Sequence, residues 1–239
     1  MWSNEIKPDH FKLGFIVSVH KKGPTTDPGN YRPLSMLHCL GKVYSRVINN
    51  RLMATCENNG LLHDAQNGFR RGRRCEDHLL TLRQTLASRK KAKSSTYLYG
   101  TDVYKAYDTV WRDGLFHRLW QAGIRGKMWR VLHDMYDNTR SVATWEGSRS
   151  TEGEFRVDMG LAQGDPLSPT LFAIFINPLL AAIEEQCTGV PLGDGGKVLH
   201  SLLFADDQLG LSSSAADTNT LITTLDTYCR SALTRTSAG

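Results

Sequence analysis

The sequence predicts an α+β fold, because its expected helices and strands do not follow the regular β-α-β order of a parallel sheet. Two observations support this prediction. Apolar residues recur at helical spacing between positions 40 and 52, namely Leu40, Val43, Tyr44, Val47, Ile48 and Leu52. The apolar run from Val198 to Phe204 is followed by alternating residues at 208–212, which predicts two antiparallel strands.

Shorter patterns predict the remaining elements. Strands are expected at Phe15–Val19 and Tyr97–Val103, and residues 142–145 and 154–157 are expected to form a hairpin. Helices are expected at 79–86, 115–122, 128–136, 171–183 and 217–229. Asp165 is suited to cap the fourth of these helices, and Pro166 fits its first turn.

Composition excludes several classes of protein. A hydrophobic share of 40% and a charged share of 22% are typical of a soluble globular chain rather than a disordered one. The longest apolar stretch, 171–183, is shorter than the roughly 20 residues of a membrane-spanning helix, so no membrane partner is expected. The five cysteines form no CxxC pair, which argues against a zinc site and favours a reducing, intracellular compartment.

Positive charge gathers in two segments of a chain with a net charge of +5. The clusters are Arg70, Arg71, Arg73 and Arg74, and Arg89, Lys90, Lys91 and Lys93. Such clusters fit binding to the phosphate backbone of a nucleic acid, which requires positive charge but no sequence readout. A solvated charged face is the alternative, and the sequence leaves both open.

Three aspartates stand where strand-like runs end. Asp206 and Asp207 follow Phe204, and Asp102 lies near the end of the run that begins at Tyr97. If these strands are neighbours, their carboxylates can share divalent ions, and two such ions about 4 Å apart can activate a 3′-hydroxyl and stabilise a leaving pyrophosphate. The alternative is a solvated loop in which water screens the repulsion between the adjacent acids.

Several sequence blocks give these aspartates a context. Phe204-Ala205-Asp206-Asp207 has the form aromatic-x-Asp-Asp, and Asp102–Val110 is a second block that begins with an acid. The other blocks are Lys21–Gly23, Asn30–Ser35, Gln66–Arg73 and Gly160–Pro169. Together the six blocks resemble, in order, the motifs of reverse transcriptases, and most closely those of non-LTR (LINE-type) retrotransposons.

The resemblance implies a right-hand polymerase of fingers and palm, with an antiparallel palm sheet backed by helices. Residues 1–95 would form mainly the fingers and 96–239 mainly the palm, with 112–160 partly associated with the fingers. Together they would make one reverse transcriptase domain. The family's thumb and lysine-containing motif are not recognisable after Leu211, so a thumb is expected to be absent.

The resemblance also assigns catalytic roles to Asp102, Asp206 and Asp207. Asp102 and Asp206 would bind the metal, Mg²⁺ or Mn²⁺, with the main-chain carbonyl of Val103 as a further ligand. Asp207 would support the site. Tyr107 would lie under the incoming sugar and exclude a 2′-hydroxyl, with a core tyrosine as the alternative.

Other positions would bind the nucleotide. By resemblance, Gln163 and Gly164 would lie beside the incoming nucleotide and template, and Arg32 with either Lys21 or Lys22 would hold the triphosphate.

Two arginines are assigned to the nucleic acid itself. Arg70 and Arg73 would contact the backbone of the template or primer, and a plain surface role is equally open for both.

The implied function is RNA-directed DNA polymerase activity, which adds deoxynucleotides to a primer 3′-hydroxyl by two-metal catalysis. An RNA template, a DNA primer and deoxynucleoside triphosphates would be its partners, the nucleus its location, and a retrotransposon protein its source. A catalytically inactive nucleic-acid-binding remnant of the same fold is one alternative. An unrelated two-metal nuclease or phosphatase is another, which shares the carboxylates but not the Gln163-Gly164 block.

Overall fold

A computed structural model describes residues 1–239 except 104, 146–147, 151–152, 194–195 and 234–239, and the side chains of residues 102, 232 and 233 also lie outside the described part. The chain divides into two compact units, each built from two separate segments. Unit 1 comprises 1–56 and 107–171, and unit 2 comprises 57–106 and 172–239. The assignment of named segments to fingers and palm stays a prediction.

The sheet of unit 1 is mixed. Its strands are β1 (Leu13–His20), β2 (Tyr31–Met36), β4 (Arg140–Trp145), β5 (Ser148–Arg149) and β6 (Phe155–Arg156). The order is β2-β1-β4-β5, with β6 paired to β4, and β1 runs antiparallel to β2 but parallel to β4. The strand predicted at 15–19 is confirmed. The hairpin predicted from 142–145 and 154–157 is confirmed only in part, because β6 pairs with Arg140 and Ser141 whereas Thr144 and Trp145 pair with β5.

Strand β2 was not predicted, because Pro33 lacks the N–H that an interior strand position needs. The structure places β2 at the edge of the sheet, where proline is tolerated.

The helices of unit 1 are α3 (Arg112–Gln121), α4 (Gly126–Tyr136) and most of α1 (Cys39–Asn58), with short 3-10 turns at Asp9–Phe11 and Pro28–Asn30. All three helices were predicted, but the buried face of α1 was assigned wrongly.

Leu40 and Val43 of α1 are 61% and 60% exposed, whereas Ile48 and Leu52 are fully buried. The buried stripe begins instead at Gly41 and Ser45, whose small side chains allow close packing at that end of the helix.

The main sheet of unit 2 has the order β3-β10-β9, formed by β3 (Tyr97–Asp102), β9 (Ser201–Phe204) and β10 (Asp207–Ser212). All its pairings are antiparallel, as predicted for residues 198–212. The single strand predicted at Val198–Phe204 is wrong, because the chain changes partner at His200. Before His200, β8 (Lys197–Leu199) pairs with β7 (Val190–Leu192), and after it β9 pairs with β10.

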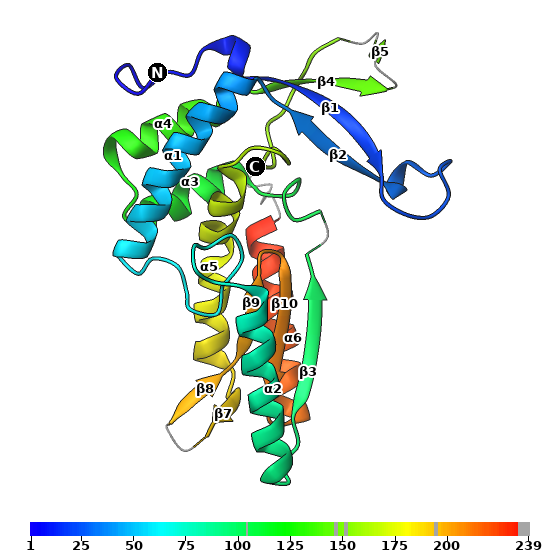
Figure 1. The fold of residues 1–239 in the computed structure, drawn as a ribbon, viewed down its shortest axis with the longest axis vertical. Coiled ribbons are helices and arrows are strands. Elements are labelled where there is room, and N and C mark those ends of the chain that lie inside the picture. Colours follow the sequence, from blue (N-terminus) through cyan, green and yellow to red (C-terminus); the bar gives the residue numbers. More distant parts are fainter. Residues whose placement is uncertain (104, 146–147, 151–152, 194–195, 234–239) are drawn as a thin grey trace. The chain divides into compact units, whose positions relative to one another are not determined.

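Helices cover both faces of this sheet (Figure 1). Gly210 of β10 lies against Leu221 of α6 (Ala215–Leu233), so the even-numbered residues of β10 face α6. On the opposite face Leu82 of α2 (Cys75–Lys91) packs beside Leu209 and Leu211. Residues 172–186 of α5 (Ser168–Gln186) complete the helices of unit 2.

Apolar residues dominate α5, as predicted for a largely buried helix, and Leu179, Leu180 and Ile183 are almost fully buried. Over the part of the chain that the structure describes, no helix has the length and hydropathy to cross a membrane.

Candidate active site

The β9–β10 hairpin and β3 bring the predicted acidic segments together in unit 2. Phe204 and Asp207 are paired across the hairpin, so Ala205 and Asp206 form its two-residue turn. Asp207 is in turn paired with Asp102 on β3. The expectation that the two strands are neighbours is therefore confirmed at the level of the backbone. Asp206 is half-buried and Asp207 is exposed, while the side chain of Asp102 lies outside the described part.

The turn that carries Asp206 is strained. Ala205 has a φ of 62°, in the left-handed region that costs a residue with a Cβ about 1–2 kcal/mol. The common two-residue hairpin turns need a positive φ at their first central position, where glycine, asparagine or aspartate is preferred. An alanine can keep this conformation only if its surroundings hold it there.

Gln66 holds this turn through both the oxygen and the nitrogen of its side-chain amide. Its Oε1 accepts hydrogen bonds from Ala205 N (3.0 Å) and Gly68 N (2.7 Å), and its Nε2 donates to Ala205 O (3.2 Å). Gln66 is 1% exposed, so water cannot replace these bonds easily. The main chain of Ala65 and Asn67 also bonds to Leu203 of β9, at 2.8 and 2.9 Å.

Gly68 is required by the same contact. A Cβ at this position would lie 2.2 Å from Ala205 N, far inside any tolerated separation. The sequence marked Gln66 and Gly68 only as part of a motif block. Their role could not be inferred because nothing local in the sequence says that residues 66 and 205 meet.

The donor chemistry at this hairpin fits a divalent cation with oxygen ligands. Carboxylates are what Mg²⁺ and Mn²⁺ prefer, and Asp206 and Asp207 are both present. Without the side chain of Asp102, the described residues contain no group of three His, Cys, Asp or Glu residues that could hold a metal. The carbonyl of Val103, predicted as a further ligand, accepts a hydrogen bond from Ala106 N (3.2 Å) and has a second lone pair available.

The predicted nucleotide-binding residues lie in unit 1, where Gln163 joins two segments. Its carbonyl accepts a hydrogen bond from Ser35 N of β2 (2.8 Å), and its Nε2 donates to Asp108 Oδ1 (3.4 Å). Gly164 has a φ of 120°, and a Cβ there would lie 2.9 Å from Ser35 O. The loop therefore needs glycine at 164 to approach β2.

Tyr107 belongs to the same arrangement, because its carbonyl accepts a hydrogen bond from Leu161 N (2.7 Å). Arg32 is exposed on β2, the strand that binds Gln163 through Ser35. Lys21 and Lys22 are exposed in the turn after β1. Unit 1 thus brings together the segments that carry Tyr107 and Gln163, with Arg32 on an adjoining strand. Their roles toward a nucleotide stay predictions.

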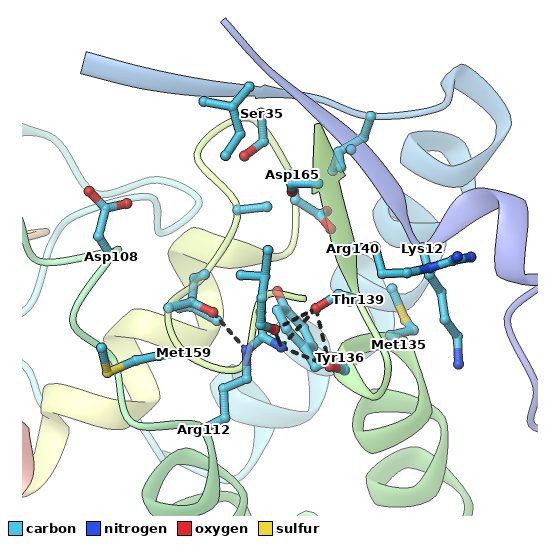
Figure 2. A pocket seen from close by; sticks show the side chains of 18 of the residues that line it. Lys12, Ser35, Asp108, Arg112, Met135, Tyr136, Thr139, Arg140, Met159 and Asp165 are labelled. Carbon is cyan, nitrogen blue, oxygen red and sulfur yellow. Dashed lines mark hydrogen bonds between the residues drawn. The ribbon is translucent and has the colours of Figure 1, made fainter. Parts of the chain in front are cut away.

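Arg112, which sequence analysis did not single out, fixes the start of the Gln163 loop (Figure 2). Its guanidinium donates to the carbonyls of Gly160 (2.9 Å), Tyr136 (2.8 Å) and Val157 (2.5 Å) and to the hydroxyl of Thr139 (2.8 Å). Arg112 is buried, and burial lowers its pKa, but arginine remains protonated in proteins. One charged group therefore ties the loop to the end of α4.

Asp165 fixes the other end of this loop. Its Oδ1 accepts from Leu167 N (3.1 Å) and its Oδ2 from the hydroxyl of Ser45 (3.2 Å), just before α5 begins. Burial raises the pKa of Asp165. The helix-capping role predicted for Asp165 is not seen as such, because its side chain accepts from Leu167 N, which precedes α5, and so fixes the turn before the helix.

Arg70 is engaged within unit 2. Its guanidinium forms two hydrogen bonds with the carboxylate of Glu57 (2.8 and 2.7 Å) and donates to the carbonyls of His63 and Gln66. Arg73 pairs with Asp64 at 2.6 Å on the surface. The predicted backbone contact of Arg70 and Arg73 stays untested. The alternative of a plain surface role is wrong for Arg70, which is 7% exposed, and fits Arg73, which pairs with the exposed Asp64.

We expect Glu57→Gln to lower the free energy of unfolding by about 1–3 kcal/mol, because it leaves the buried guanidinium of Arg70 without its anion. The matched control, Asp64→Asn, removes an exposed partner and should cost less than about 1 kcal/mol. Urea denaturation measures both. Equal losses in the two variants would contradict the structural role of Arg70.

The same comparison has a defined pH dependence. Hydrogen bonding to Arg70 lowers the pKa of Glu57 from its ordinary value of 4.5, so the ionised carboxylate stabilises the folded state. This contribution is complete above the unfolded pKa and is lost as pH falls through the lower folded pKa. The stability difference between the wild type and Glu57→Gln should therefore shrink below about pH 4.5.

For the hairpin turn, Gln66→Met keeps the shape of the side chain but removes its hydrogen bonds. The main-chain groups of Ala205 are then left unpaired in a buried position, at a cost of about 1–3 kcal/mol. Amide exchange at Ala205 and Gly68 should accelerate with it. Gln84→Met, on an exposed position of α2, should change stability by less than about 0.5 kcal/mol. If both variants are equally stable, Gln66 does not hold the turn.

The chain is similar to known proteins over residues of both units. A family profile described as "Reverse transcriptase (RNA-dependent DNA polymerase)" matches residues 19–238. The type-1 retrotransposable element R2 polyprotein of Popillia japonica is 29% identical over 89% of the chain, and the probable RNA-directed DNA polymerase from transposon BS of Drosophila melanogaster is 28% identical over 93%. The chain spans 29% and 24% of their respective lengths.

Solved structures agree on the fold. Apo telomerase from Candida tropicalis, truncated from its C-terminal domain, matches 95% of the chain with a TM-score of 0.64 at 14% identity, and the chain covers 49% of it. Telomerase from Candida albicans, solved with a fragment of telomeric RNA, matches 97% with a TM-score of 0.65 at 8% identity, and 42% of it is covered. The predicted α+β fingers-and-palm fold is thereby confirmed. Since the family profile covers far more than half of its residues, the chain belongs to the reverse transcriptase family.

Proposed function

We propose that this chain carries the nucleotidyl-transfer site of an RNA-directed DNA polymerase, as part of a longer retrotransposon protein. The observation that carries the proposal is the register of unit 2, which pairs Asp207 with Asp102 and leaves Asp206 in the adjoining turn. Acids from two separate segments are thus fixed on one sheet. An RNA template, a DNA primer and deoxynucleoside triphosphates are the proposed partners.

Asp102 and Asp206 are the proposed ligands of Mg²⁺ or Mn²⁺, with Asp207 supporting them. Reverse transcriptases generally use divalent ions, which when bound supply the charge that stabilises attack of a 3′-hydroxyl on a phosphate. The chain itself supplies rigidity. Gln66 fixes the turn that carries Asp206, so the backbone that carries this carboxylate is already in place before a substrate binds.

Tyr107 is the proposed discriminator between deoxynucleotides and ribonucleotides. Its carbonyl is held by Leu161 N and it lies next to Asp108, which bonds to Gln163. A half-buried ring on a fixed backbone can reject an added hydroxyl by steric exclusion. Gln163 and Gly164, fixed to β2 through Ser35, would then line the position of the incoming nucleotide.

Primer extension on an RNA template tests the proposed activity. With Mg²⁺ the wild-type chain should extend a DNA primer, and Asp206→Asn should reduce the rate by about a thousandfold, roughly 4 kcal/mol in the barrier. Asp226→Asn, an exposed carboxylate on α6, should leave the rate unchanged. Salt-sensitive RNA binding by a wild-type chain that gives no extension would instead identify a non-catalytic binding remnant.

A second assay addresses Tyr107 by comparing deoxynucleotide with ribonucleotide incorporation. Tyr107→Ala opens space for a 2′-hydroxyl and should reduce the preference for deoxynucleotides by about 10- to 100-fold, the range expected when a steric contact is lost. Tyr107→Phe keeps the ring and should retain the preference. A preference that survives in Tyr107→Ala would assign the tyrosine to the core instead.

A further inference from the structure

Unit 1 contains a cavity of about 270 Å³ that the proposed polymerase function does not use (Figure 2). Its walls come from β1, β2, β4, the end of α4 and residues 157–165. Its volume lies just below the range of about 300–1,000 Å³ typical of small-molecule sites. Phe155 and Met159 on its wall are 46% and 45% exposed, so the cavity reaches the surface near them.

Much of the wall is apolar. Phe11, Met135 and Leu161 are all buried and all line the cavity. An apolar ligand body placed here would leave water and contact these side chains, which is favourable in proportion to the area covered.

One charged group in the wall is poorly matched. Lys7 is 5% exposed, and no ion pair of its ammonium occurs among the described residues. Asp134 is already engaged, since its Oδ1 binds Lys12 Nζ (3.0 Å) and its Oδ2 accepts the main-chain N–H of Lys7 (2.6 Å). Both oxygens of Asp165 likewise accept hydrogen bonds from other groups. Burial lowers the pKa of Lys7, and electrostatic attraction by Asp165 and Asp134 offsets this only in part.

A second polar group in the wall is also available for hydrogen bonding. Tyr136 is 6% exposed, and its hydroxyl has no hydrogen-bond partner in the described part of unit 1. Burial raises the pKa of Tyr136, and the nearby Ser168 hydroxyl offsets this only in part. That serine donates its own hydrogen to Ala162 O (2.8 Å). Buried polar atoms without partners are rare, and each marks a position where a ligand or water can bind.

The cavity wall contains four cationic residues, namely Lys7, Lys12, Arg112 and Arg140. Lys12 pairs with Asp134 and Arg140 pairs with Glu154, while Arg112 donates from Nε and Nη1 to three carbonyls and a hydroxyl. Among the described residues Lys7 has no ion pair, so its ammonium is the one that can pair with a ligand anion.

We propose that this cavity binds a small amphipathic carboxylate, with its apolar chain against Phe11, Met135 and Leu161 and its carboxylate paired with Lys7. The Tyr136 hydroxyl donates a further hydrogen bond. The site touches Ser35 and Ala162, which hold or adjoin Gln163, so a bound ligand would contact the segments that position the proposed nucleotide site. The binding itself does not depend on polymerase activity.

Calorimetric titration of the folded chain with octanoate tests this proposal, with octan-1-ol as the probe that keeps the apolar chain but lacks the charge. Lys7→Gln should weaken octanoate at least about tenfold, as expected on losing a charged hydrogen bond. Its affinity for octan-1-ol should be unchanged. The control Lys90→Gln, on the exposed end of α2, should bind both probes as the wild type does.

Ile16→Phe supplies an independent variant, because it fills the cavity from β1 without changing charge. It should weaken the binding of both octanoate and octan-1-ol. If Lys7→Gln does not fold, Ile16→Phe still tests whether the two probes bind in this cavity. The proposal is overturned if the wild type shows no saturable octanoate binding. It is equally overturned if Ile16→Phe binds octanoate as tightly as the wild type, or if a folded Lys7→Gln does.

Discussion

The positive φ of Ala205 is the constraint around which unit 2 is organised. A turn of two residues places Asp206 beside the pairing of β10 with β3, and that turn needs a backbone conformation that alanine resists. Gln66 compensates by bonding to both sides of Ala205. Gly68 has to lack a side chain so that Gln66 can come this close. The candidate metal site therefore depends on a segment well over a hundred residues earlier in the chain.

In unit 1, buried charged side chains hold the loop that carries Gln163. The loop that carries Gln163 has no regular secondary structure, so its main-chain groups need partners outside helices and sheets. Arg112 supplies donors at its start and Asp165 supplies acceptors at its end. A buried guanidinium is stabilised where its N–H groups meet carbonyl or hydroxyl oxygens, as Nε and Nη1 of Arg112 do. Lys7 lacks such an arrangement, which distinguishes it from Arg112.

Local patterns predicted most elements of the fold, but not contacts between distant segments. The helices and the β9–β10 hairpin follow from apolar spacing, and the position of Asp206 in the turn follows from the hairpin. The buried face of α1 was missed because apolar spacing alone does not distinguish Leu40, which is exposed, from Leu52, which is buried. The strand break at His200 was missed because no glycine or proline within residues 198–204 marks it, although the pairing changes there from β7 to β10.

The motif blocks contain two physically different kinds of residue. Asp206 and Tyr107 are the residues proposed to act on a metal and a nucleotide, and the proposed roles require a carboxylate and a ring at these positions. Gln66, Gly68 and Gly164 instead hold segments together, since their types are set by a hydrogen bond or by a close backbone approach. A sequence block alone does not separate these roles. Arg70 illustrates the consequence: its charge suggested a phosphate contact, yet its guanidinium binds Glu57 and the carbonyl of Gln66, so it stabilises the segment that holds the Asp206 turn.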